Sequence, residues 1–365
     1  MNLRGFISPL LFATLVTTSC IQEEPLNAEC DITGFSLENP YLVGAPTINN
    51  NQILLMATDS LTLSKDIHSL APTLTLTEGA SVVPANGTVR DFANPDDCSY
   101  TVYSQDGKWH KTYTVRIIPP EIPTYHSFEK TIKLPYFYEF IQEDLDLGYV
   151  FTWETANLGY RMCGQAKDHY DYPTIPEADG YKGAAVKLVT RSTGFFGSMV
   201  GMPLAAGNLF IGHFDVANAT TKPMEATQFG RPFKKIPFAL TGWYKYKPGA
   251  IFTDKNKNPL PDRTDECDIY GVLYESTDEV PYLTGDNVLS HENIVALARL
   301  ENGKAVGEFT KFNLPFEYRK QIDAEKLAQL KYKLSLVFTS SRDGAFFEGA
   351  VGSELVVDEV KLICN

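Results

Sequence analysis

An aromatic run interleaved with lysines is the stretch of this sequence best suited to holding a small polar ligand. It reads Gly-Trp-Tyr-Lys-Tyr-Lys and ends at Lys247. Along an extended strand, Tyr244 and Tyr246 would share one face, and Trp243 would share the other with Lys245 and Lys247. Sugars present C–H faces and many hydroxyls, which proteins bind with flat aromatic rings and polar side chains. Because lysines are rarely buried without a partner, we expect Trp243 to face solvent.

Other residues combine aromatic and polar groups in the same way. Trp153 lies close to Glu154 and Asn157 in the sequence, and Tyr270 shares a strand face with Asp268. The alternative for any single aromatic residue is a place in the core or at its rim.

Arg231 is followed by Pro232, which restrains it to an extended conformation. A fixed guanidinium fork suits a pair of sugar hydroxyls or a uronate carboxylate, and the alternative is a structural salt bridge. The predicted ligand-binding residues are Trp153, Glu154, Asn157, Arg231, Trp243, Tyr244, Tyr246, Asp268 and Tyr270.

Signals for catalysis are weak. A glycosidase needs two carboxyl groups about 5–10 Å apart, and the 45 acidic residues of this chain always offer some candidates, Glu154 and Asp268 among them. The sequence contains no Gly-x-Ser-x-Gly, no His-Glu-x-x-His and no glycine-rich phosphate loop before a helix. A non-catalytic role is therefore favoured, with a glycoside hydrolase or polysaccharide lyase as the alternative.

The composition predicts a folded protein built from strands. The 365 residues include 32 Lys and Arg against 45 Asp and Glu, and the net charge of −13 argues against a nucleic-acid partner. Frequent turns are expected from 26 Gly and 22 Pro, and this suits β-structure better than a helical bundle.

The N-terminus resembles a bacterial lipoprotein signal. Residues 1–19 contain Arg4 and then an apolar run over 6–16 that is too short to span a bilayer, and Cys20 follows Thr-Thr-Ser. The resemblance implies a lipid on Cys20, a tether over 20–30 and an outer-membrane location. The acidic residues that follow resemble the surface-export signal of Bacteroidetes lipoproteins, and a solvated acidic linker is the alternative. For the signal itself, the alternative is an ordinary secretory signal with a chance Cys.

Two β-domains follow the tether. Residues 31–118 contain short alternating runs, with Asp106-Gly107 closing a hairpin, and predict a small sandwich. Export permits a disulfide, for which Cys30 and Cys98 are the candidates. Three prolines make 119–124 a linker, and 125–365 reads as long strands with one short helix at 323–330.

Both domains resemble Bacteroidetes families. The segment from Pro84 to Val115 resembles an immunoglobulin-like repeat of surface proteins. Segments across the second domain resemble the putative carbohydrate metabolism domain family, and these include Trp153-Glu-Thr-Ala-Asn157, Leu240-Thr-Gly-Trp-Tyr-Lys-Tyr-Lys-Pro-Gly249 and Ser340-Ser-Arg-Asp-Gly344. The resemblance implies an all-β protein: an N-terminal immunoglobulin-like sandwich, then a larger jelly-roll sandwich resembling carbohydrate-binding modules.

The same resemblance to jelly-roll carbohydrate modules implies a structural Ca²⁺. Such modules hold the ion with one carboxylate from the opening strand and one from the closing strand, which here are Glu129 and Asp358. The alternative is that both are simple surface acids.

The sequence thus predicts a surface-anchored, non-catalytic lipoprotein that captures oligo- or polysaccharide through its jelly roll. Its partners would be the glycan, the membrane through the lipid only, and outer-membrane glycan-uptake proteins. An adhesive or assembly protein without a sugar ligand is a further alternative.

Replacing Cys20 with Ala should abolish membrane association and leave the folded body intact, because the lipid is the sole expected anchor. Fractionation of cells expressing each form, with a thermal melt of the recovered protein, measures both effects. Recovery of the variant in the membrane fraction would contradict the lipid anchor.

Overall fold

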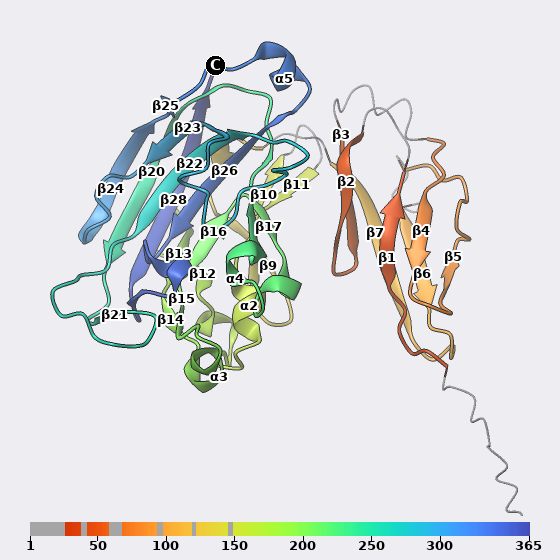
Figure 1. Cartoon of the computed structure of the whole chain (residues 1–365), viewed down its shortest axis with the longest axis horizontal. Helices are drawn as coiled ribbons and strands as arrows, with labels where there is room; N and C mark the ends of the chain where they lie inside the picture. Colours follow the sequence, from red (N-terminus) through yellow and green to blue (C-terminus); the bar gives the residue numbers. More distant parts are fainter. Residues whose placement is uncertain (1–25, 38–41, 58–67, 93–97, 119–121, 145–148) are drawn as a thin grey trace, which may run out of the picture. The chain divides into compact units, whose positions relative to one another are not determined.

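The computed structural model of the chain describes residues 26–37, 42–57, 68–92, 98–118, 122–144 and 149–365 (Figure 1). Cys20 and the predicted signal lie outside these ranges. No described helix is long and apolar enough to cross a membrane. The chain divides into two compact units, with the change at Arg116 and Ile117.

The first unit is an immunoglobulin-like sandwich. One sheet pairs β1 (Ile32–Ser36) with β4 (Thr73–Leu76), and the other has the order β2 (Leu42–Asn49), β3 (Gln52–Ala57), β7 (His110–Ile118), β6 (Ser99–Tyr103) and β5 (Ser81–Val83). The alternating Tyr and Val residues of β6 and β7 point inward, and the predicted hairpin between these strands is confirmed. At its turn the Ser104 hydroxyl donates to the Asp106 carboxylate at 2.6 Å.

Cys30 and Cys98 are not joined by a disulfide bond in the structure. The buried Cys98 thiol instead donates a hydrogen bond to the carbonyl oxygen of Phe92 at 3.4 Å. The predicted pairing is therefore not found.

The second unit is built on two antiparallel sheets packed face to face. The first, here called the β20 sheet, has the order β12 (Thr174–Glu177), β13 (Ala185–Val189), β28 (Glu354–Cys364), β20 (Pro237–Lys247) and β24 (Val306–Pro315), with β8 (Tyr125–His126) beside β28. The second, here called the β22 sheet, has the order β16 (Asn208–Phe210), β26 (Tyr332–Thr339), β22 (Asp268–Glu275), β23 (Ile294–Arg299) and β25 (Glu317–Tyr318), with β19 (Arg231–Pro232) beside β26.

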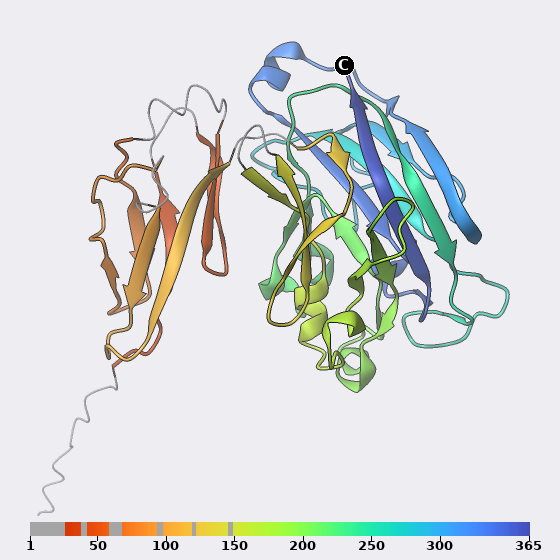
Figure 2. The same ribbon diagram turned by 180° about the vertical axis from the view of Figure 1, so that it is seen from behind.

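Shorter elements surround these sheets. The remaining strands form a three-stranded sheet of β9 (Lys130–Lys133), β10 (Tyr138–Asp144) and β11 (Tyr149–Thr152), and the pairs β14 (Arg191–Ser192) with β15 (Leu204–Ala205), β17 (Gly212–Phe214) with β18 (Thr227–Phe229), and β21 (Phe252–Thr253) with β27 (Gly349–Ala350). The helices are α2 (Asn157–Arg161), η2 (His169–Asp171), α3 (Gly194–Met199), η3 (Val216–Asn218), α4 (Pro223–Ala226), α5 (Ala324–Ala328) and η4 (Gly344–Phe346). In Figures 1 and 2, α2, α3 and α4 gather at one end of the second unit and α5 lies at the other.

The main core fills the space between the two sheets. Leu240 and Tyr244 of β20 face Ile269 and Leu273 of β22 across it, all at 5% exposure or less. A second cluster covers the opposite face of the β22 sheet and includes Tyr270. The β22 sheet is therefore buried on both faces, whereas the outer face of the β20 sheet carries exposed and half-buried side chains.

The predicted all-β architecture is confirmed, and so is the predicted short helix, which is α5. Asp323 caps its first turn, because its carboxylate accepts from the backbone N–H groups of Glu325 and Lys326. The short helices α2, α3 and α4 were not predicted.

Candidate functional site

A pair of stacked aromatic rings lies on the outer face of the β20 sheet. The ring of Tyr181 lies 3.8 Å from that of Trp243 with an interplanar angle of 9°, and Phe309 of β24 meets Tyr181 edge-on at 6.0 Å. Tyr181 is 46% exposed. The ammonium of Lys245 lies 4.7 Å from the centroid of Phe309. We call Tyr181, Trp243 and Phe309 the aromatic platform.

Strand alternation places the platform as expected from the sequence. Trp243 and Lys245 are half-buried and Lys247 is exposed on the solvent side of β20, while Tyr244 and Tyr246 point into the core. The Tyr246 hydroxyl donates to the Ser340 carbonyl at 3.1 Å inside the protein. Both rings pack between the sheets, which contradicts the predicted ligand contact of Tyr246. Tyr244 also borders a surface hollow beside Phe312, so its predicted contact stays a prediction.

Two carboxylates fix the loop that carries Tyr181. The backbone N–H of Lys182 donates to Asp358 Oδ2 at 2.9 Å, and that of Ala184 donates to Glu129 Oε2 at 3.1 Å. Gly183 adopts a positive φ of 68°, and a Cβ there would come within 2.2 Å of the Glu129 carboxylate. The two residues predicted to bind calcium thus hold the loop that completes the platform.

These carboxylates do not form a calcium cage as they stand. Both oxygens of Asp358 accept backbone N–H groups, from Lys182 and from Glu359 at 2.7 Å. Burial raises the pKa of Asp358, and the charges of Glu359 and Glu129 add to the rise. Within the described ranges, no three His, Cys, Asp or Glu residues are arranged to hold a metal ion. Calcium therefore stays a prediction, and the loop contacts give both residues a role without it.

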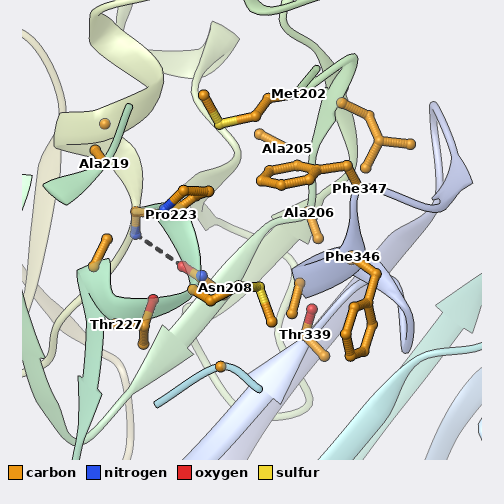
Figure 3. Close-up of a pocket in the computed structure, with 18 of the residues that line it drawn as sticks. Met202, Ala205, Ala206, Asn208, Ala219, Pro223, Thr227, Thr339, Phe346 and Phe347 are labelled. Atoms are coloured by element: carbon orange, nitrogen blue, oxygen red, sulfur yellow. Dashed lines mark hydrogen bonds between the residues drawn. The ribbon is translucent and has the colours of Figure 1, made fainter. Parts of the chain in front are cut away.

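A cavity of about 230 Å³ lies over the outer face of the β22 sheet (Figure 3). Its floor is formed by β16, β22 and β26, and its walls come from α2, α3, α4 and the segment around η4. Met202 and Phe347 lie on one side of it, and Asn208 and Thr339 lie on the other (Figure 3).

Asp268 and Tyr270, both predicted from the sequence, line this cavity from β22. The carboxylate of Asp268 accepts three hydrogen bonds from Arg299, at 2.6, 3.0 and 3.2 Å. Burial raises the pKa of Asp268, and the Arg299 contacts oppose the rise. Asp268 is thus a buried ion-pair member that also reaches the cavity floor.

Trp153 and Asn157 are structural. Trp153 is 2% exposed in the main core, where its indole N–H donates to Nδ1 of His126 at 3.2 Å. The Asn157 side chain is fully buried and bonds both backbone groups of Thr174, at 2.8 and 3.0 Å. Their predicted roles as ligand contacts are wrong because neither side chain reaches the surface.

Glu154 and Arg231 form a separate, largely buried cluster. The Arg231 guanidinium donates to the carbonyl oxygens of Thr152 at 3.1 Å and Gly212 at 3.4 Å, and lies 3.9 Å from Glu154. Burial raises the pKa of Glu154 to about 7; Arg231 opposes the rise and Glu139 adds to it. Of the two interpretations of Arg231, these contacts favour the structural one.

Tyr181 and Phe309 are the platform residues that the sequence analysis missed. Tyr181 lies in a turn bounded by Gly180 and Gly183, which gives no strand periodicity to place its ring. In the sequence, the position of Tyr181 between two glycines was the only feature that could have pointed to an exposed ring.

Comparisons with known proteins agree with this architecture. Residues 127–363 match the family described as Putative carbohydrate metabolism domain, and residues 32–117 match the family described as SGBP, N-terminal. No curated protein matches the chain.

Crystal structures similar to this chain include two from Bacteroides species. One, of a putative glycoside hydrolase from Bacteroides thetaiotaomicron, has 46% identity and a TM-score of 0.86, and the match covers 94% of this chain and 99% of that one. Another, of a putative glycoside hydrolase from Bacteroides vulgatus, has 38% identity and a TM-score of 0.64, covering 67% of this chain and 99% of that one.

Asp358→Ala should lower the free energy of unfolding by about 1–3 kcal/mol, because two backbone N–H groups lose their acceptor. Thermal melts in EDTA and in millimolar calcium separate this loop role from metal binding. An equal loss in both buffers is the result expected from the loop role alone. A wild-type melting temperature that falls in EDTA, with a variant insensitive to EDTA, would show calcium at this position.

Glu154→Gln should become more stable relative to wild type as pH rises. The folded pKa of about 7 lies above the ordinary value of 4.5. The wild type therefore has its full stability below pH 4.5 and loses part of it as pH rises through 7. Urea denaturation from pH 4.5 to 8 measures the free energy of unfolding of both proteins. The difference between variant and wild type should grow by about 1–3 kcal/mol in favour of the variant over this range. The exposed Glu301→Gln is the control, and a flat difference for Glu154→Gln would refute the buried-acid assignment.

Proposed function

Because this chain belongs to the putative carbohydrate metabolism domain family, we propose that it is a non-catalytic glycan-binding protein whose second unit captures oligo- or polysaccharide on the aromatic platform. The observation that carries the proposal is the stacked pair of Tyr181 and Trp243 on an outer sheet face. A fixed, exposed ring is the surface on which the C–H face of a sugar packs.

Polar side chains around the platform are suited to sugar hydroxyls. Lys187 and Glu177 form an ion pair beside Lys245, and the positive charges of Lys187 and Lys245 help to lower the pKa of Glu177. Lys311 pairs with Trp243 across the β20–β24 ladder and is exposed. Such groups fix the orientation of a ligand that the rings hold.

The proposed setting is the cell surface, with the lipid on Cys20 as anchor and the first unit as spacer. The match of residues 32–117 to the SGBP, N-terminal family supports a surface-associated protein. Outer-membrane uptake proteins would then receive the captured glycan.

Hydrolysis is the second proposed function, because the relatives are described as putative glycoside hydrolases. Glu154 is the residue that favours it, since a general acid needs a raised pKa and that of Glu154 is about 7. Incubation of the protein with each bound glycan, followed by analysis of new reducing or unsaturated ends, distinguishes an enzyme from a binder. Failure of a glycan array to show any ligand would favour the adhesive alternative.

Tyr181→Ala should weaken glycan binding by about 1–3 kcal/mol, the scale of one aromatic anchor, with little change in stability. Trp243→Ala should weaken binding to a similar extent, because the same stack is lost. A glycan array selects the ligand, and calorimetric titration with matched denaturant melts measures both quantities.

Phe238→Ala is the control, because Phe238 is a 61% exposed aromatic residue of the same strand outside the platform. Unchanged affinity in both platform variants would exclude this surface as the binding site. A loss of about 3–5 kcal/mol in stability for Trp243→Ala would instead place its ring in the core.

A further inference from the structure

We propose that the cavity over the β22 sheet is a second binding site, for a compact, uncharged molecule with an apolar body and one hydrogen-bond-accepting end. It lies on a different sheet from the aromatic platform and shares no residue with it. The proposal therefore does not depend on glycan binding.

The size and walls of the cavity fit an aromatic or branched aliphatic body. Its 230 Å³ exceeds the roughly 150 Å³ of an engineered apolar void that admits benzene. Protein interiors are otherwise packed without such gaps. Methionine and phenylalanine side chains line the cavity, among them Met202, Met224, Phe210, Phe214, Phe346 and Phe347. Thioethers make favourable contacts with aromatic rings.

Hydrogen-bond donors without partners mark one end. Tyr270 is 5% exposed, its hydroxyl makes no hydrogen bond to a described residue, and the hydroxyl is not among the fully buried unbonded atoms, so it reaches the open space of the cavity. Asn208 uses its Oδ1 to accept from the Ala156 N–H at 2.8 Å, and its Nδ2 has no acceptor in the described part of the chain. Donors that face the cavity in this way are available to a ligand or to water. Among the described residues that line the cavity, the fully buried polar side-chain atom without a hydrogen bond is Nε of Arg342, and leaving such an atom unbonded is costly.

The charges at the cavity floor are already neutralised. Asp268 is paired with Arg299 at 2.6 Å, and Arg342 is paired with Glu266 at 3.0 Å. A charged ligand would lose its hydration without gaining a free counter-ion. The bound end is therefore a carbonyl, ether or hydroxyl oxygen.

Access runs through an apolar rim. Phe196 of α3 is 44% exposed and Phe346 of η4 is 54% exposed, and both belong to the cavity lining. The short helices that close the cavity thus leave its mouth open to solvent.

The proposed ligand class can be tested on the purified full chain with three small molecules: acetophenone, ethylbenzene and benzoate. Calorimetry and saturation-transfer NMR measure their binding. The three molecules share the ring and differ in the acceptor and the charge. We expect acetophenone to bind about five- to tenfold more tightly than ethylbenzene, the scale of one hydrogen bond, and benzoate to bind more weakly than either. No binding of acetophenone up to its solubility limit, or tighter binding of benzoate, would overturn the proposal.

Tyr270→Phe should lower acetophenone affinity about five- to tenfold and leave ethylbenzene affinity unchanged. Tyr274→Phe is the matched control: it lies on the same face of β22, its hydroxyl donates to the Phe229 carbonyl, and it does not line the cavity. Equal acetophenone affinities in Tyr270→Phe and wild type would overturn the polar-end assignment.

Tyr181→Ala separates the two sites. It should retain acetophenone affinity even if the glycan proposal fails, and Tyr270→Phe should retain glycan affinity. Loss of glycan binding in Tyr270→Phe would make the cavity the glycan site and overturn the second-ligand proposal.

Discussion

The arrangement of the second unit depends on the burial of strand β22 from both sides. Ile269 and Leu273 point into the space between the sheets, while Tyr270 and Val272 point to the opposite face. A sheet that is apolar on both faces needs a third layer, because exposed apolar surface of that extent is unfavourable in water. Short helices and small strand pairs supply this layer. The cavity is the space that they leave open above β16, β22 and β26.

The outer face of the β20 sheet, by contrast, carries exposed and half-buried side chains along β20 and β24, and this leaves room for the extended ligand proposed above. Its outer side chains are lysines and rings, with Trp243 covered on one face by Tyr181. A long glycan chain needs an open surface, whereas a compact molecule is bound best by an enclosed space. One domain thus presents two chemically different surfaces on opposite sides of a single core.

The strands could be predicted because their alternation follows from the sequence. Trp243 and Lys245 were placed on the solvent side by that rule. Alternation could not show whether Trp153 is a core residue or a ligand-binding residue, because its polar neighbours Glu154 and Asn157 resemble a binding cluster. The cavity walls could not be predicted either, since α3 reads Gly-Phe-Phe-Gly-Ser-Met and has no helical apolar stripe.

Buried carboxylates explain why candidate sites are hard to choose from acidic residues alone. Asp265 is 1% exposed and accepts from the hydroxyls of Ser341 and Ser353 at 2.6 and 2.7 Å. Asp358 acts in the same way on the loop that carries Tyr181. An ionised acceptor can hold several donors from segments distant in the sequence, so it fixes loops that apolar packing alone would leave undetermined. If the platform binds glycan, Asp358 influences that binding without touching the sugar, because it positions the ring that does.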